Sequence, residues 1–297
     1  MEAVTRDRVP ARVRTADSGG NKRRFNSWAW LVLPGMLFLI AFFVVPIAGM
    51  AVRSFTDPGP ENYLIFVKSG LYARVLWTTI RTAFVVTLVC LLLGYPYAYV
   101  MLKVGPKLTA VLGVLVLLPF WSSILVRTYA WTVLLQDSGI INSALKSLGV
   151  ISQPLQLMRN DLGVTIGMSH ILLPYMVFPI YAVMTRISPD LVPAAQSLGA
   201  PPYRAFLRVF WPQSVPGVAA GVLLVFVLSL GFFITPALLG SPSNTMFSVL
   251  VVNEVSQMLQ FGRGSALAVV LLLVTLVLLW FGRRFLPAGL LDQGNTE

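Results

Sequence analysis

The sequence predicts an all-α polytopic membrane protein with six transmembrane helices, and its composition, hydropathy and segment lengths carry that prediction. Of the 297 residues, 57% are hydrophobic and 11% are charged, against about 25% charged residues in soluble domains. The mean hydropathy is +0.79. Six apolar segments reach the roughly 20 residues that a helix needs to cross a hydrocarbon core about 30 Å thick. They cover about 28–52, 76–102, 108–135, 162–184, 215–238 and 264–283.

The first apolar segment is expected to be a retained span, because its roughly 25 residues exceed the 7 to 15 of a signal-peptide core. The region before it, 1–27, contains seven basic residues and is predicted to be a disordered cytoplasmic tail that sets topology. Binding to anionic lipid headgroups is the alternative role for this tail. Residues 285–297 are expected to form a cytoplasmic C-terminal tail, after a six-span membrane domain over 28–284.

The distribution of basic residues predicts the orientation. Six spans place both termini on one side, where fourteen Lys and Arg residues lie, against six on the other side. The positive-inside rule then puts both termini in the cytoplasm. Topology therefore accounts for most of the net charge of +11, and no nucleic-acid partner is expected.

Several other function classes lack the residues that they need. Cys90 is the single cysteine, so neither an intramolecular disulfide nor a cysteine metal cluster can form. The chain has no Gly-x4-Gly-Lys-Ser/Thr loop for ATP. No Asp or Glu falls within the six predicted spans, which argues against intramembrane catalysis and against a secondary transporter driven by an ion gradient.

The stretch "AAQSLGAPPYRAFLRVFWP" interrupts the apolar sequence at Ala194–Pro212. Asp190 can cap a first short helix, and Gly199 suits its C-terminal end. A second helix is predicted over Tyr203–Phe210, ended by Pro212. By the predicted topology, both helices belong to a cytoplasmic loop over 186–214.

Two short amphipathic helices joined by a tight break can dock onto a partner protein. Small residues at Ala194, Ala195 and Gly199 allow close approach, and the aromatic Tyr203 supplies area that a partner can bury. The alternative is that this segment lies on the lipid headgroups, and the residues alone leave both open.

The spacing of this loop resembles the cytoplasmic "EAA" signature of bacterial ABC importer permeases, Glu-Ala-Ala-x3-Gly-x9-Ile-x-Leu-Pro. Residues that match in type and position are Ala194, Ala195, Gly199 and Pro212. The resemblance implies that the loop is a coupling helix in a groove of a cytoplasmic ATPase. It implies that the coupling residues are Ala194, Ala195, Gly199, Tyr203, Arg204 and Pro212.

Two residues depart from this signature. Pro193 replaces the usual Glu and Trp211 replaces the usual aliphatic residue. The carboxylate of the signature is therefore absent from the loop. Docking is expected to depend more on shape and on apolar contact.

The resemblance extends to the spermidine/putrescine-type permeases, particularly the first of their two permease subunits. It rests on four segments, "LLLGYPYAYVM" (Leu91–Met101), "LLPFWSSILVRTYAW" (Leu117–Trp131), "GIIN" (Gly139–Asn142) and "FITPALLGSP" (Phe233–Pro242). The implied fold is that of a type I importer permease in the bacterial inner membrane. The implied partners are a distinct second permease, an ATPase dimer that uses ATP and Mg, a periplasmic or lipid-anchored solute-binding protein, and membrane lipids. No cofactor is expected on this chain itself.

A polyamine-like solute follows from the resemblance. Polyamines are cations, for which carboxylates or aromatic faces would form the pathway, and only aromatics are available within the predicted spans. Candidate pathway residues are Trp121, Arg127, Tyr129, Phe232, Phe233 and Thr235. For Trp121, a place in the aromatic belt at the outer membrane interface is the alternative.

Three further polar residues lie at or within predicted spans. Arg81 and Arg127 either snorkel to the outer interface or line the pathway. If either lines the pathway, it would favour an anionic or zwitterionic solute such as a phosphonate, an amino-acid derivative or a sugar conjugate. His170 is expected to make a hydrogen bond between helices, since no partners for a metal or proton role lie nearby in sequence.

Overall fold

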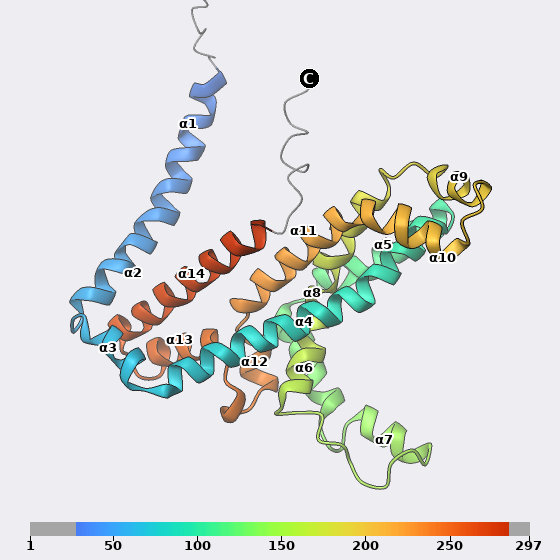
Figure 1. Cartoon of the computed structure of the whole chain (residues 1–297). Coiled ribbons are helices and arrows are strands. Elements are labelled where there is room, and N and C mark those ends of the chain that lie inside the picture. The colour runs from blue at the N-terminus through green and yellow to red at the C-terminus, as the bar shows by residue number, and fades with distance from the viewer. Residues whose placement is uncertain (1–27, 285–297) are drawn as a thin grey trace, which may run out of the picture. The chain divides into compact units, whose positions relative to one another are not determined.

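The computed structural model describes residues 28–284, and throughout this range it contains helices and connecting loops without a β-strand (Figure 1). The predicted all-α membrane fold is confirmed. The tails expected at 1–27 and 285–297 lie outside the described residues. The chain divides into two units, which meet between Ala48 and Gly49.

The first unit is an apolar helix. It contains α1 (Trp28–Leu39), a π turn (Ile40–Val44) and the start of α2 (Val45–Thr56). The stretch Val32–Thr56 is long and apolar enough to cross a membrane. Large side chains such as Phe42 and Phe43 are exposed along it, at 70% and 69%, as expected of a helix that contacts lipid or other membrane helices.

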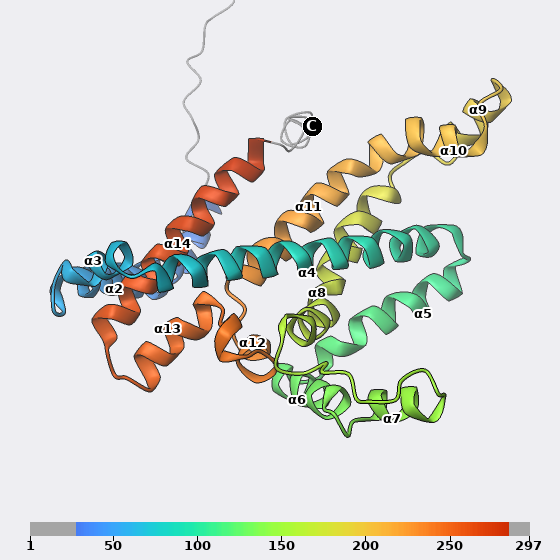
Figure 2. The ribbon, with the colours of Figure 1, turned by 60° about the horizontal axis from the view of Figure 1, so that its bottom comes forward.

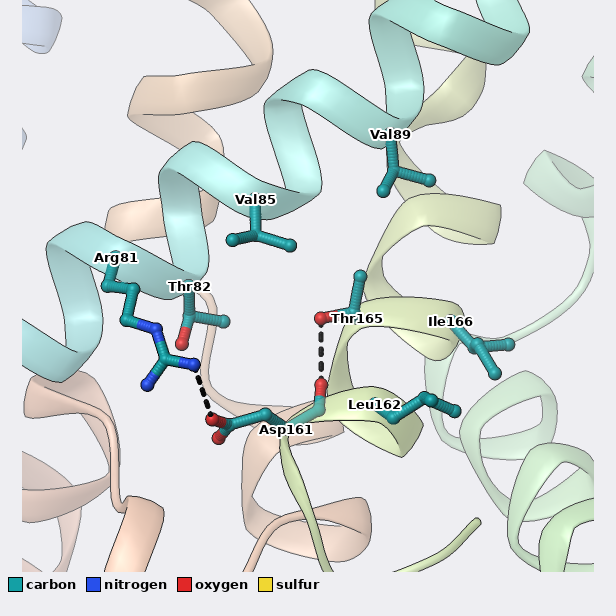
Figure 3. Close-up of a pocket in the computed structure, with 8 residues that line it drawn as sticks. All are labelled: Arg81, Thr82, Val85, Val89, Asp161, Leu162, Thr165 and Ile166. Carbon is teal, nitrogen blue, oxygen red and sulfur yellow. Dashed lines mark hydrogen bonds and ion pairs between the residues drawn. The ribbon is translucent and has the colours of Figure 1, made fainter.

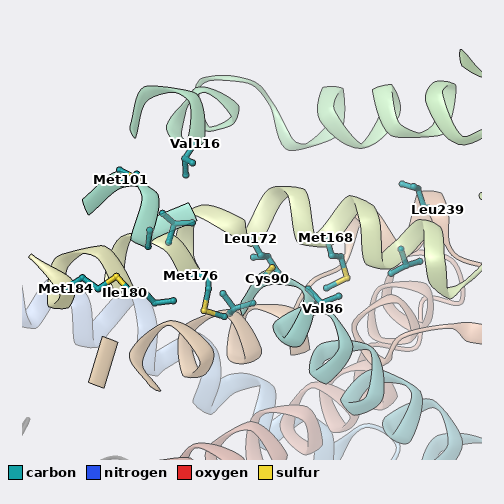
Figure 4. Close-up of a cluster of buried hydrophobic side chains, with 14 of the residues drawn as sticks. Val86, Cys90, Met101, Val116, Met168, Leu172, Met176, Ile180, Met184 and Leu239 are labelled. Carbon is teal, nitrogen blue, oxygen red and sulfur yellow. The ribbon is translucent and has the colours of Figure 1, made fainter. Parts of the chain in front are cut away.

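Three long helices form the centre of the second unit: α4 (Gly70–Lys103), α8 (Asp161–Met184) and α11 (Trp211–Leu230). Figures 1 and 2 show them side by side. Their contact surface is rich in methionine, and Figure 4 shows Met168 and Met176 of α8 beside Val86 and Cys90 of α4. These four side chains are fully buried.

Glycine allows α11 to approach α8 closely. A Cβ atom at Gly217 would lie 2.9 Å from the carbonyl oxygen of Pro179, and one at Gly221 would lie 2.8 Å from Sδ of Met176. Both distances are shorter than real Cβ contacts. Small residues at such crossings are typical of packed membrane helices.

The third predicted span, 108–135, is bent. It consists of α5 (Pro106–Leu117), a 3-10 turn (Leu118–Trp121) and α6 (Ile124–Leu135). The pair of arms Pro106–Trp121 and Ile124–Ser147 is bent by 98°. Pro119 lies in the turn and lacks the N–H that a continuing helix needs. Within residues 28–284, five single helices are therefore long and apolar enough to cross a membrane, and the bent pair makes a sixth span if it is counted as one.

The predicted end of a helix at Pro212 is wrong. The helix runs without interruption over Pro202–Leu230, through α10 (Pro202–Ala205), a π turn (Phe206–Phe210) and α11. The N–H of Trp211 donates to the carbonyl oxygen of Phe206, five residues back. This wider turn directly precedes Pro212 and gives room for a ring that would clash with a regular helical turn.

The fifth span ends in a break within the region 215–238. After Leu230 the chain leaves the helix, and α12 (Ile234–Leu239) follows. A 3-10 turn (Pro242–Asn244), α13 (Phe247–Ser256) and α14 (Phe261–Arg284) complete the chain. The shorter helices α3 (Glu61–Lys68), α7 (Ile140–Ser147) and α9 (Leu191–Ser197) lie in connections.

Candidate functional site

The loop between α8 and α11 begins with α9, whose C-terminal end has a defined geometry. Gly199 has φ = +88°, its N–H donates to Gln196 O at 2.9 Å, and the N–H of Ala200 donates to Ala195 O at 3.1 Å. This is the Schellman pattern that glycine favours after a helix. Asp190 occupies the N-cap position, but its side chain makes no capping hydrogen bond.

The outer edge of this loop has no partner within the described part of the chain. Leu198 is 90% exposed and Tyr203 is 60% exposed, and Ala194 and Gly199 are also exposed. The guanidinium of Arg204 lies 5.7 Å from the centre of the Tyr203 ring. Figure 2 shows α9 and α10 projecting from the end of the second unit where α4 ends.

The inner edge of the loop is anchored to α4 by aromatic rings. Tyr99 packs edge-on against Phe206 and Phe210, with ring centroids 5.5 and 5.4 Å apart. Tyr95 packs against Trp211, with ring centroids 4.8 Å apart, and its hydroxyl lies 3.0 Å from Oγ of Ser214. A force on the loop therefore acts directly on α4 and α11.

The candidate pathway residues separate into exposed and buried groups. Trp121 and Tyr129 are 77% and 66% exposed, and Phe233 lines a cavity of about 420 Å³ between α11, α13 and α14. Phe232 packs against the main core, and its carbonyl accepts a hydrogen bond from Ser248 at 2.6 Å. Two of these four residues are thus mostly exposed, one lines this cavity and one packs in the core.

Thr235 has a structural position. Its side chain is fully buried, and its hydroxyl lies 3.1 Å from that of Thr128 on α6. In this arrangement it fastens α12 to α6 and faces no open surface.

Arg127 and His170 lie in a polar and aromatic region between α6 and α8. The Nε1–H of Trp131 donates to Nδ1 of His170 at 3.3 Å, which is the interhelical bond expected for this histidine. The Nε atom of Arg127 is buried and has no hydrogen-bond partner among the described residues. Part of the Arg127 guanidinium is therefore enclosed by the protein.

The family model of the binding-protein-dependent transport system inner membrane component matches residues 23–288. The chain belongs to this family.

Several relatives of this permease are named as permeases of spermidine/putrescine transport systems. The spermidine/putrescine transport system permease protein PotB of Haemophilus influenzae is 32% identical over 255 residues, which cover 82% of this chain and 89% of that protein. PotB of Escherichia coli is 34% identical over 229 residues, which cover 76% and 83%. The assignment to an ABC importer permease of this type is confirmed, and the similarity to these permease subunits indicates a transport role.

Solved structures confirm the permease fold. A chain of the bacterial alginate ABC transporter, in complex with alginate pentasaccharide-bound periplasmic protein, superposes with a TM-score of 0.68 at 20% identity. The match covers 86% of this permease and 92% of that chain. At this identity the likeness concerns the fold, which is that of a multi-pass inner-membrane component.

Asp161, which the sequence places in a loop just outside the fourth predicted span and which was not among the candidate site residues, is the first residue of the permease's α8. Its carboxylate lies 3.5 Å from Nη2 of Arg81, at the edge of a cavity of about 380 Å³ between α4 and α8 (Figure 3). Arg81 thus has a partner, and a carboxylate stands at the end of a span. Asn160 at the helix start was a usable signal, since its side chain caps α8 by accepting from Gly163 N at 2.8 Å.

Glu254 is a second acid outside the predicted spans, and it lies in α13 with 5% exposure. Its Oε2 is 3.9 Å from Nη1 of Arg263 on α14. The pair bridges the two helices that flank the turn 257–260. The spacing of an acid and a base nine residues apart does not by itself indicate a buried pair, so the sequence alone gave no signal for it.

Proposed function

We propose that this permease forms half of the translocation pathway of an ABC importer for a polyamine-like solute such as spermidine or putrescine. The loop over 186–214 couples closure of a cytoplasmic ATPase dimer to movement of the spans. The partner ATPase uses ATP and Mg, a second and distinct permease completes the pathway, and a periplasmic or lipid-anchored binding protein delivers the solute. Lipids surround the assembly.

The observation that carries the substrate proposal is the similarity to the PotB proteins. Identities of 32% and 34% extend over more than three quarters of both chains. Similarity of this extent covers the spans as well as the loop. It supports a solute of the same class.

The observation that supports coupling is the two-sided construction of the loop. Its outer edge exposes Leu198 and Tyr203, while its inner edge packs on Tyr99. An exposed leucine beside a small-residue helix end suits a groove in another protein. Ala194, Ala195, Gly199, Arg204 and Pro212 complete the proposed coupling surface.

The proposed orientation places both termini in the cytoplasm, on the same side as this loop. The positive-inside rule supports it. The solute then passes aromatic surfaces, for which we propose Trp121, Tyr129, Phe232 and Phe233. Arg127 lies on the same helix as Tyr129, and Thr235 supports this region from the buried contact between α12 and α6. Each cation–π contact contributes about 0.5 to 2 kcal/mol, which is enough to guide a cation without trapping it.

An anionic or zwitterionic solute is the second candidate. The partly enclosed guanidinium of Arg127, whose Nε lacks a partner among the described residues, favours it. A carboxylate or phosphonate could supply the missing acceptor.

The test is ATP hydrolysis by the complete transporter, reconstituted in lipid with its binding protein. Putrescine, spermidine, an amino-acid derivative and a phosphonate are compared at saturating concentration. Stimulation by the polyamines is expected. Stimulation by the phosphonate alone would replace the polyamine proposal by the second candidate, and uptake that persists when the ATPase is inactivated would overturn the ABC mechanism for this chain.

A further inference from the structure

The cavity between α4 and α8 combines a carboxylate with an aliphatic wall. Arg81 and Asp161 stand at one end of it, and Figure 3 shows Val85 and Val89 continuing along α4, with Ile166 on the facing helix. Arg81 and Val89 are two helical turns apart, so the wall runs for roughly 12 Å. The volume of the cavity, about 380 Å³, lies in the lower part of the range for small-molecule sites, about 300 to 1,000 Å³.

The ion pair at the mouth of the cavity is weakly held. Its single contact is 3.5 Å long, and the side chains are 61% exposed for Arg81 and 36% for Asp161. Pairs this exposed contribute little, because water competes for both charges. In the part of the chain that the structure describes, neither charged group makes a further hydrogen bond, so a ligand can take the place of one partner.

Asp161 is the fixed member of the pair. Asn160 caps the helix directly before it, and Thr165 donates to the backbone oxygen of Asp161 at 2.7 Å. Arg81 has a long side chain that is already mostly in solvent, so it can swing away while Asp161 stays in place.

We propose that this cavity binds the aliphatic amine end of the transported solute, with an ammonium group on Asp161 and the methylene chain along Val85, Val89 and Ile166. The inference rests on the proposed polyamine function and assigns Asp161 as the carboxylate that binds the ammonium group. Arg81 is a resident counter-ion that the arriving ammonium displaces. An aliphatic dicarboxylate is disfavoured, because its carboxylate would meet Asp161.

The test is protection of a cysteine placed in the cavity. Val85→Cys is introduced into the complete transporter, and labelling by a neutral maleimide is followed with putrescine, butylamine or adipate present. The native Cys90 is fully buried and supplies the background. Bound ligand slows labelling by a factor of 1 + [L]/Kd, about tenfold at ten times Kd.

We expect putrescine and butylamine to protect the introduced thiol and adipate to leave it reactive. Asp161→Asn should abolish protection, and Arg81→Gln should strengthen it because the resident competitor is gone. Asp137→Asn is the matched control, because Asp137 is an exposed acid outside the cavity. In this variant putrescine should protect the introduced thiol as well as it does in the parent. Arg81→Gln also tests the site if Asp161→Asn fails to assemble.

Protection that survives Asp161→Asn would overturn the inference, and so would protection by adipate. The same preparation is assayed for ATP hydrolysis stimulated by putrescine and by spermidine. Stimulation without protection refutes this site and leaves the proposed function standing, whereas absence of both stimulation and uptake refutes the proposed function itself.

Discussion

Tyr99 of α4 packs edge-on against Phe210, with ring centroids 5.4 Å apart and ring planes at 80°. Phe210 is the last residue of the π turn that joins the loop to α11, and it is 4% exposed. The contact therefore joins the loop to a second span that is more than 100 residues away in sequence. Movement of the loop should reach α4 through this ring pair.

We expect Tyr99→Ala to lower transport per ATP hydrolysed while ATP hydrolysis continues. The substitution removes two edge contacts, each worth about 0.5 to 1.5 kcal/mol. The measurement is the ratio of solute imported to ATP hydrolysed in proteoliposomes. Trp77→Ala is the control, because Trp77 lies on the same helix and is 67% exposed. A ratio that Tyr99→Ala leaves unchanged would refute transmission through these rings.

A substitution at Leu198 tests whether the outer edge of the loop docks onto the ATPase. Leu198→Asp puts a charge on a side chain that is 90% exposed, so the free energy of unfolding should change by no more than about 0.5 kcal/mol. Docking should nevertheless weaken, since a desolvated carboxylate opposes apolar contact. We expect loss of ATPase co-purification and of uptake. Leu148→Asp, at a leucine with 75% exposure near α7, should affect neither; retention of the ATPase by Leu198→Asp would argue against docking at this edge.

Two substitutions at Gly199 distinguish the effect of a bulky side chain from the effect of backbone strain. Its φ of +88° disfavours other residues, although asparagine tolerates this region better than most. A Cβ atom here would meet nothing within 4 Å, so a larger side chain projects away from the chain. We expect Gly199→Trp to insert normally and abolish uptake, with Gly199→Asn keeping most of it. Membrane insertion and uptake are measured together, and uptake by Gly199→Trp equal to that of Gly199→Asn would contradict a docked partner.

The sequence contained enough to predict the helical class and the first half of the loop. Apolar segment length identifies spans because the bilayer sets the required length. Gly199 was recognisable as a helix end because its lack of a Cβ permits positive φ. These features depend on local chemistry, which a single chain displays directly.

Features that depend on tertiary contacts could not be predicted in the same way. The helix continues through Pro212 because a π turn precedes it, and nothing in the local sequence marks that turn. The 98° bend within 108–135 occurs beside Pro119 and the serines Ser122 and Ser123, but proline is tolerated within membrane helices, so these residues do not by themselves mark a break. The Arg81–Asp161 pair needed two helices to be placed side by side, so the acid looked like a loop residue.

Substitution of Arg127 tests which of the two candidate solute classes the pathway favours. Two unit charges about 8 Å apart interact by about 2 kcal/mol at an effective dielectric of 20. Removing this charge should therefore change the uptake of a singly charged cation or anion roughly thirtyfold, in opposite directions for the two signs of charge. We expect Arg127→Leu to raise uptake of putrescine relative to a phosphonate in competition assays. Arg74→Leu, at an exposed base near the start of α4, is the control. An unchanged competition profile would remove Arg127 from the pathway.

Gly217 tests the close packing of α8 and α11. Gly217→Ala would place a Cβ 2.9 Å from the backbone oxygen of Pro179 and 3.0 Å from Cα of Ile180, and backbone atoms cannot move aside as a flexible side chain can. Overpacking of this kind costs about 1 to 3 kcal/mol. We expect a lower temperature of heat-induced aggregation in detergent, read by size-exclusion chromatography after heating. Gly231→Ala is the matched control, because its Cβ would meet nothing within 4 Å. If the aggregation temperature falls equally in both variants, the effect of Gly217→Ala comes from reduced backbone freedom. Close contact of the two helices at Gly217 would then be contradicted.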